Sequence, residues 1–258
     1  MRGIVSIIFI LFLMQQIAVA QNGEGTTNRV GIIYNTEKAI KVRFQTNGFA
    51  LSWNKGKIQT YYKTRFVNYE IGYLKSNREL SQRFDLRNPF TTQAARSFVF
   101  GKQNSLYVLR AGIGSKRYFS DKAKRRGIAV GVQYDGGISL GLQIPYYLEL
   151  LRYKDNGSIP YFSTEKYSEE NKDVFTDINR IFGGATFFKG FDEVKPVPGL
   201  YLRTDLLFEW DAFEEYFAGM KAGVQLDVYP QGVPIMINTP KQLLFLNLYI
   251  TLELGKRK

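Results

Sequence analysis

One stretch of the sequence constrains the fold more than any other, namely GIAVGVQYDGGISLGLQI at Gly127 to Ile144. Its even positions are apolar with one exception, whereas its odd positions carry glycine, alanine or short polar side chains. Successive side chains of a β-strand point to opposite faces, so the alternation predicts one long strand with one apolar face. The phase does not shift at Gly136-Gly137, which favours a glycine bend within the strand over a hairpin turn.

The same alternation recurs along most of the chain. Six further segments show it: Phe49–Trp53, Val67–Tyr73, Tyr107–Ile113, Leu200–Trp210, Tyr216–Val228 and Leu244–Leu254. An eighth strand is expected at Arg29–Tyr34, before the strand that carries Ile40, Val42 and Phe44. That next strand changes phase at Thr46-Asn47-Gly48, which either a β-bulge or a two-residue hairpin turn would explain. We favour the bulge because it keeps the number of strands even.

The connections between these strands alternate in length. Short turns are expected at Asn54–Lys57, Ser120–Arg126 and Asp211–Glu214, and long connections at Ser76–Ser97 and Arg152–Pro198. The second long connection contains the one helical pattern, a short amphipathic segment at Asn171–Phe182. Outer-membrane barrels combine short periplasmic turns with long external loops in this way.

These patterns predict an all-β fold, a closed antiparallel up-and-down transmembrane β-barrel of about eight strands with long loops and one short loop helix. A soluble periplasmic β-sandwich also alternates and stays an alternative. Two observations favour the barrel. The longest strands exceed the usual strand of roughly 5–6 residues. The non-apolar face is mostly small, as the crowded interior of a narrow barrel requires.

The N-terminal residues have the pattern of a secretory signal peptide. A basic start precedes an apolar run from Ile4 to Met14, and Ala18-Val19-Ala20 resembles a cleavage site. We therefore expect a cleaved signal peptide at residues 1–20, a single barrel domain at residues 21–258, and a location in the cell outer membrane.

Nine charged residues share the face opposite the apolar one, which is the inner face of the expected barrel. They are Glu70, Arg110, Asp135, Arg203, Asp205, Glu209, Lys221, Asp227 and Glu253. Charges of both signs in a narrow interior are stable when they pair with one another. We therefore expect a lumen charge network that fills the barrel, although a conducting path stays open as an alternative.

Two further segments are candidate contact surfaces. The basic run KAKRR contains Lys122, Lys124, Arg125 and Arg126, which would suit either a solvated turn or contact with an anionic surface. The proline-rich segment Val228–Pro240 could dock a partner or fold back over the barrel mouth. The formal net charge of +12 suits anionic lipid, and an exported protein rarely meets nucleic acid. Expected partners are therefore outer-membrane lipids, including lipopolysaccharide, and proteins of an envelope complex.

The sequence offers little for catalysis. It contains no His and no Cys, so it lacks the usual general base and the commonest metal ligand. The adjacent acidic pairs Asp192-Glu193 and Glu214-Glu215 fall in loops or turns, where solvation explains them. We predict no catalytic residue, no metal site and no cofactor, and a protein that is not an enzyme.

Several phrases, taken in order, resemble a known family. They are TNGFALSWNKGK, SFVFGKQNSLYVLRAGIG, GGISLGLQIPYYLEL, FFKGFDEVKPVPGLYLRTDLLFEW, YPQGVPIM and LYITLELGKRK. As a set they are similar to uncharacterised outer-membrane β-barrel proteins of the Bacteroidota. The resemblance implies an outer-membrane location and no particular activity.

The function expected from these observations is that of a structural or accessory subunit of an envelope secretion, insertion or surface-assembly machine. A small outer-membrane transporter or pore is the second hypothesis. The opposite signs of the expected lumen charges count against it.

Overall fold

The computed structural model describes residues 34–82, 96–119, 128–154, 159–186, 188–210 and 214–258. The expected signal peptide and the basic residues Lys122, Lys124, Arg125 and Arg126 lie outside the described residues, as does the strand expected at Arg29–Tyr34 except for Tyr34.

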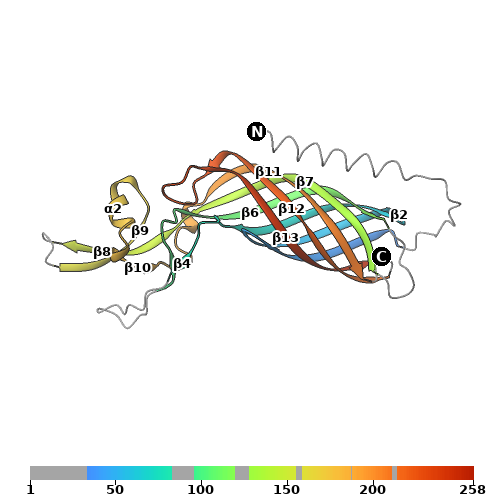
Figure 1. Ribbon diagram of the computed structural model, residues 1–258, viewed down its shortest axis with the longest axis horizontal. Coiled ribbons are helices and arrows are strands. Elements are labelled where there is room, and N and C mark those ends of the chain that lie inside the picture. The colour runs from blue at the N-terminus through green and yellow to red at the C-terminus, as the bar shows by residue number, and fades with distance from the viewer. Residues whose placement is uncertain (1–33, 83–95, 120–127, 155–158, 187, 211–213) are drawn as a thin grey trace. The chain divides into compact units, whose positions relative to one another are not determined.

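Eight antiparallel strands close into a barrel (Figure 1). In chain order they are β1 (Thr36–Gln45), β2 (Gly48–Thr60), β3 (Lys63–Leu74), β6 (Asn104–Tyr118), β7 (Ile128–Pro145), β11 (Lys195–Trp210), β12 (Tyr216–Val233) and β13 (Gln242–Arg257). The first strand pairs with the last, from Glu37 opposite Arg257 to Gln45 opposite Tyr249. The closed barrel confirms the predicted fold class and excludes a sandwich of two separate sheets.

The two faces of the wall are those that the alternation predicts. In β13, Leu246 is 63% exposed on the outer face, whereas its neighbours Phe245 and Asn247 are fully buried inside. All eight strands carry exposed large apolar side chains on the outer face. The buried core of the barrel is therefore its interior, and the continuous apolar face of the strands points outward.

Strand β7 runs through the Gly-Gly pair without a turn, as predicted. Gly137 lies opposite Gly112 of β6 in the strand register. A Cβ atom on Gly137 would lie 2.2 Å from the carbonyl oxygen of Ala111, and one on Gly112 would lie 2.5 Å from that of Gly136. The glycines are needed here because the two backbones approach too closely for side chains.

The expected bulge at Thr46-Asn47-Gly48 is wrong, because these residues form the hairpin between β1 and β2. Gln45 pairs with Gly48 across a turn made by Thr46 and Asn47. Gly48 has a φ of +137°, which other residues rarely adopt. A two-residue turn and a bulge shift the phase equally, so the pattern alone could not separate them.

The short turn expected at Asn54–Lys57 is also wrong, because these residues lie inside β2. The turn that follows β2 is at Tyr61–Tyr62. The strand total is nevertheless eight, since Thr36–Gln45 is a barrel strand of its own.

The connections divide between two ends of the barrel. The turn end holds the Tyr61–Tyr62 turn, the connections 119–127 and 211–215, the start of β1 and the end of β13. The loop end holds the Thr46-Asn47 turn and the connections 75–103, 146–194 and 234–241. Both predicted long connections are at the loop end, as expected of an up-and-down membrane barrel.

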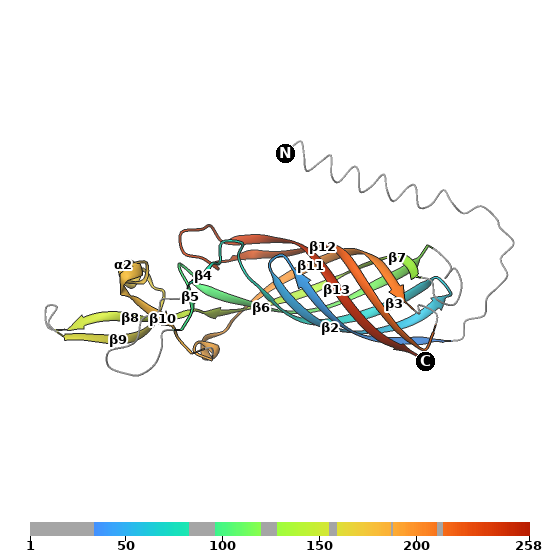
Figure 2. The same ribbon diagram turned by 60° about the horizontal axis from the view of Figure 1, so that its bottom comes forward.

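The loop-end connections contain small elements of their own (Figure 2). A three-stranded sheet has the order β10 (Ile181–Gly184), β8 (Tyr147–Lys154), β9 (Ile159–Lys166), and β4 (Ser81–Gln82) pairs with β5 (Phe98–Val99). The short helical turns are η2 (Glu169–Asn171), α2 (Lys172–Phe175), η3 (Ile178–Arg180) and η4 (Phe191–Glu193). Of the helix expected at Asn171–Phe182, only Lys172–Phe175 is α-helix; Ile178–Arg180 is the separate turn η3, and Ile181-Phe182 belong to β10.

The three-stranded sheet has its own apolar core. Phe98, Leu148, Leu150, Phe175, Ile181 and Ile237 are buried together in it.

Among the described residues, no helix is long and apolar enough to span a membrane.

Candidate functional site

The barrel interior is the candidate functional site, because the charged residues of the wall gather there. Seven cations and seven anions of the barrel strands are almost completely buried. They are Lys41, Arg43, Arg110, Lys116, Arg203, Lys221 and Arg257, with Glu37, Glu70, Asp135, Asp205, Glu209, Asp227 and Glu253. Their formal charges cancel, so the interior carries a balanced network rather than a field of one sign.

Glu70 of β3 is the centre of the part nearest the loop end. Its Oε2 accepts hydrogen bonds from Nη1 of Arg43 at 2.6 Å and Nη1 of Arg203 at 2.9 Å. Its Oε1 accepts one from Nη1 of Arg110 at 2.5 Å. The carboxylate of Glu70 thus connects β3 to three other strands, since the arginines come from β1, β11 and β6.

Two further carboxylates balance these arginines. Arg110 donates from Nε to Oδ1 of Asp227 at 2.7 Å and from Nη2 to Oδ2 at 3.0 Å. Arg203 makes the same bidentate contact with Asp135, from Nε to Oδ1 at 2.9 Å and from Nη2 to Oδ2 at 2.5 Å. Three cations therefore meet three anions, and the bidentate geometry offsets the desolvation that burial imposes on each charge.

A second group lies in the middle of the barrel. Glu253 pairs with Lys221 and, through Oε1 at 3.5 Å, with Lys41. The Oδ2 atom of Asp205 accepts a hydrogen bond from the hydroxyl of Tyr249 at 2.8 Å. Gln133 joins Asp205 to the other three, because its Nε2 donates to Oδ2 of Asp205 at 3.5 Å and its Oε1 accepts from Nζ of Lys221 at 2.6 Å. This group again contains two cations and two anions.

A third group lies at the turn end. Lys116 Nζ lies 2.7 Å from Oε1 of Glu37 and 2.9 Å from Oε1 of Glu209. Arg257 Nη2 completes the ring, at 3.1 Å from Oε2 of Glu37 and 2.9 Å from Oε2 of Glu209. Tyr118 adds a hydroxyl hydrogen bond to Glu209. The charge network therefore extends along the barrel from the Glu70 group to the turn end.

An apolar plug fills the interior between this network and the loop-end mouth. It consists of Leu74, Leu106, Val108, Val197, Tyr229, Val233, Ile235, Met236 and Phe245. Most of these side chains come from the inner faces of the strands, whereas Ile235 and Met236 come from the connection after β12. These side chains are packed against one another, and a close-packed apolar cluster leaves no space for water. The plug therefore closes this mouth.

The connection after β12 folds back over the mouth, which was one of the two alternatives for Val228–Pro240. The N–H of Gln103 donates to the carbonyl of Ile235 at 2.8 Å, and Asn104 Nδ2 donates to the carbonyl of Pro234 at 2.6 Å. Ile235 and Met236 are 3% and 8% exposed, so these apolar side chains are not available for docking a partner.

All nine residues expected in the lumen network lie in the barrel interior. Five members were missed by the sequence reasoning: Glu37, Lys41, Arg43, Lys116 and Arg257. Lys41 and Arg43 alternate with Ile40, Val42 and Phe44, so their inward direction was readable from the phase. Lys116 and Arg257 lie beyond the predicted ends of their strands.

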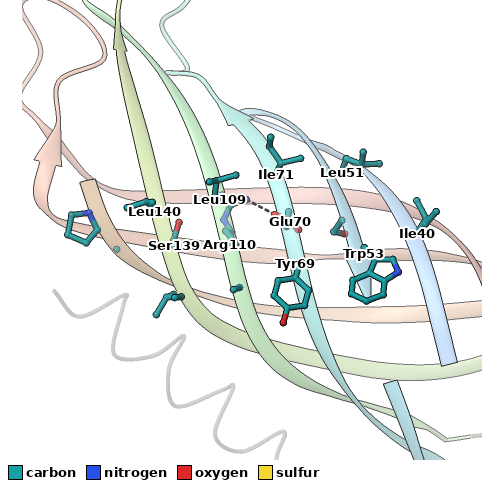
Figure 3. A pocket seen from close by; sticks show the side chains of 15 residues that line it. Ile40, Leu51, Trp53, Tyr69, Glu70, Ile71, Leu109, Arg110, Ser139 and Leu140 are labelled. Atoms are coloured by element: carbon teal, nitrogen blue, oxygen red, sulfur yellow. Dashed lines mark hydrogen bonds and ion pairs between the residues drawn. The ribbon is translucent and has the colours of Figure 1, made fainter. Parts of the chain in front are cut away.

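Figure 3 shows both faces of the wall. Tyr69 and Ile71 stand on the outer side of β3, and Glu70 between them reaches Arg110 inside. The pocket drawn there is bounded mainly by outward-facing apolar side chains such as Leu51 and Leu140. We therefore assign it to the outer wall and not to a ligand site.

The described residues include no group of three or more acidic side chains arranged to hold a metal ion.

No protein-family profile matches this sequence, and no curated protein matches it. Among solved structures, the N-terminal β-barrel domain of Pseudomonas aeruginosa OprF is similar at 8% identity and a TM-score of 0.34, over 87% of this chain and 98% of that one. Neisserial surface protein A is similar at 11% identity and a TM-score of 0.32, over 85% of this chain and 95% of that one. Likeness at this level adds nothing to what the strand pairing shows by itself.

Proposed function

We propose that this chain is an integral outer-membrane protein with a closed barrel, and that it serves as a non-enzymatic structural or accessory subunit of an envelope secretion, insertion or surface-assembly machine. The observation that carries the first part is the apolar outer face of all eight strands. Soluble monomers rarely expose contiguous apolar patches beyond a few hundred Å².

The height of the apolar face suits a membrane. In β13 the outward leucines and isoleucine run from Leu244 to Leu254, all more than half exposed. The ten residue steps from Leu244 to Leu254, at about 3.4 Å each and tilted by roughly 45°, span about 24 Å, close to the apolar band of outer-membrane barrels. Lipids of the outer membrane, including lipopolysaccharide, are the partners that such a face requires.

The closed interior supports a structural role over a transporter or pore. The charges inside are balanced, most of them are joined in ion pairs, and the loop-end mouth is filled by the apolar plug. A small eight-stranded barrel has room for little more than its own side chains. Among the described residues outside the barrel, the loop-end sheet of β8, β9 and β10 is the surface that we propose for contact with other proteins.

Two measurements test this proposal. The purified protein should give no conductance in planar lipid bilayers, and steady channel currents would favour the pore. Mild detergent extraction followed by affinity purification should recover the protein with a stoichiometric envelope partner. A variant lacking the β8–β9 hairpin, from Leu148 to Glu165, should lose that partner and still migrate as a folded barrel. Retention of the partner by this variant would contradict the role of the loop-end sheet.

A further inference from the structure

A row of five aromatic rings crosses from the barrel wall onto a segment outside it. Phe49 of β2, Tyr73 of β3 and Tyr107 of β6 occupy the outer face near the loop end, with centroid distances of 6.0 Å and 5.2 Å. Phe191 lies 6.5 Å from Tyr107, and Phe188 lies 6.0 Å from Phe191. The last two rings belong to the connection between β10 and β11, so the row continues beyond the strands.

The three barrel rings form the row because of the strand register. Phe49 is paired with Tyr73, and Tyr73 with Tyr107, across adjacent strands. The hydroxyl of Tyr73 accepts a hydrogen bond from Lys102 Nζ at 2.7 Å. Lys102 is also paired with Glu79, which accepts a hydrogen bond from the same hydroxyl at 3.4 Å. An outward ring with a hydrogen-bonded hydroxyl gives Tyr73 the amphipathic character of tyrosines at a membrane–water interface.

The segment Phe188–Glu193 is held in place by backbone geometry. The N–H of Lys189 donates to the carbonyl of Thr186 at 2.9 Å, and that of Glu193 to the carbonyl of Gly190 at 3.0 Å. Gly190 has a φ of +93°, and a Cβ atom there would lie 2.8 Å from the carbonyl oxygen of Pro145. The segment therefore sits directly against the end of β7.

The exposure of the two rings and the neighbouring Lys189 fit a lipid surface. Phe188 is 74% exposed and Phe191 is 45% exposed, although both rings lie in one row with the membrane-facing wall. Lys189 is exposed beside them, with its Nζ 5.6 Å from the ring centroid of Tyr147. Aromatic rings with a neighbouring cation are suited to the boundary between acyl chains and phosphate-bearing headgroups.

We infer that Phe188–Glu193 is a lipid anchor, which inserts Phe188 and Phe191 into the interface of the outer leaflet as an extension of the barrel's aromatic row. The inference rests on the proposed membrane location. The anchor would fix the base of the connection that carries β8, β9 and β10, because η4 lies between that sheet and β11 in the chain.

Tryptophan quenching by lipids brominated on their acyl chains tests the anchor. The native Trp53 and Trp210 are 40% and 41% exposed on the outer face, so the wild-type protein in such vesicles reports whether the barrel is in the bilayer. Both are then replaced by Phe, and single tryptophans are introduced by Phe188→Trp or, on β8, by Tyr153→Trp. Tyr153 is 50% exposed and lies about 20 Å along β8 from Tyr147, so it serves as the control.

We expect Phe188→Trp to lose emission in brominated vesicles and to shift its emission maximum to the blue, and Tyr153→Trp to do neither. Quenching of native Trp53 and Trp210 without quenching at position 188 overturns the anchor and leaves the membrane location intact. Absence of quenching in the wild-type protein overturns the membrane location itself. Equal quenching at positions 188 and 153 also overturns the anchor, because the whole loop-end sheet would then lie on the membrane. If Phe188→Trp does not fold, Phe191→Trp gives the same readout.

Discussion

Arg203 and Asp135 face each other directly across the paired strands β11 and β7, and two hydrogen bonds of 2.9 Å and 2.5 Å join them. Arg203 also donates to Glu70 on β3. The pair therefore fixes the register of two neighbouring strands and connects them to the other side of the barrel. The same use of buried charge recurs through the interior, where each group contains as many cations as anions.

The Arg203–Asp135 pair predicts a strongly non-additive pair of substitutions. Arg203→Met should lower the free energy of unfolding by about 3–5 kcal/mol, because it leaves Asp135 as a buried charge without its main partner. Arg203→Met combined with Asp135→Leu should recover a large part of that loss. Urea unfolding in detergent micelles, followed by tryptophan fluorescence, measures both. A double variant as unstable as the sum of the single ones would contradict the account.

At Gly131 the inner face of β7 should tolerate no large side chain, unlike the outer face at Val130. A Cβ atom on Gly131 would lie 2.5 Å from the carbonyl oxygen of Arg117, and Val130 is outward-facing and 36% exposed. Gly131→Leu should therefore sharply reduce the fraction of protein that migrates as folded barrel on unheated gels. Val130→Leu, the adjacent control, should leave that fraction unchanged. Equal tolerance at the two positions would reverse the assignment of faces.

The apolar plug should contribute more to stability than the apolar outer face. Phe245 is fully buried against Tyr229, with ring centroids 5.8 Å apart, whereas its neighbour Leu246 faces outward. Phe245→Ala should cost about 3–5 kcal/mol, because it leaves a cavity in a packed interior. Leu246→Ala should cost less, since acyl chains fill the space that it vacates. Urea midpoints in lipid vesicles measure both, and the opposite ranking would place the packed core elsewhere.

The loop-end sheet should loosen in acid. Hydrogen bonds from Arg152, at 2.9 Å and 2.7 Å, lower the pKa of Glu165 below its ordinary value of 4.5 and outweigh its partial burial. A carboxyl group whose pKa is lowered by folding stabilises the fold above the unfolded pKa and loses that contribution as the pH falls through the folded pKa. Proteolysis of the β8–β9 hairpin should therefore accelerate below about pH 4.5. Glu165→Gln should remove this pH dependence, and a variant that keeps it would implicate another group.

Much of the barrel could be predicted from the sequence, because a two-residue period carries both the strand and its direction. The phase of the alternation places Leu246 on the outer face and Asn247 on the inner face, as the structure has them. Because the phase does not change at Gly136-Gly137, it also predicts that β7 continues through these two glycines. The phase could not identify the hairpin at Thr46-Asn47, since a two-residue turn and a one-residue bulge both move the apolar side chains from even to odd positions.

The interior could be predicted only in part. Alternation indicates that Glu70 points inward, but the convergence of Arg43, Arg110 and Arg203 on it depends on strand order and register around the closed barrel. The loop-end sheet was missed because the sequences of β8 and β9, YLELLRYK and IPYFSTEK, do not alternate strictly between apolar and polar residues. The aromatic row was missed for a different reason, since Phe191 and Tyr107 are far apart in the sequence and meet only in the fold.

Whether the barrel spans the outer membrane can be measured by fractionation of cells that express the chain, combined with migration on gels before and after heating. We expect the protein to sediment with the outer membrane, to resist extraction by carbonate, and to require detergent for release. The unheated protein should migrate differently from the heated one, as closed membrane barrels do. Full recovery in the soluble fraction without detergent, with one heat-independent band, would contradict a membrane-spanning barrel.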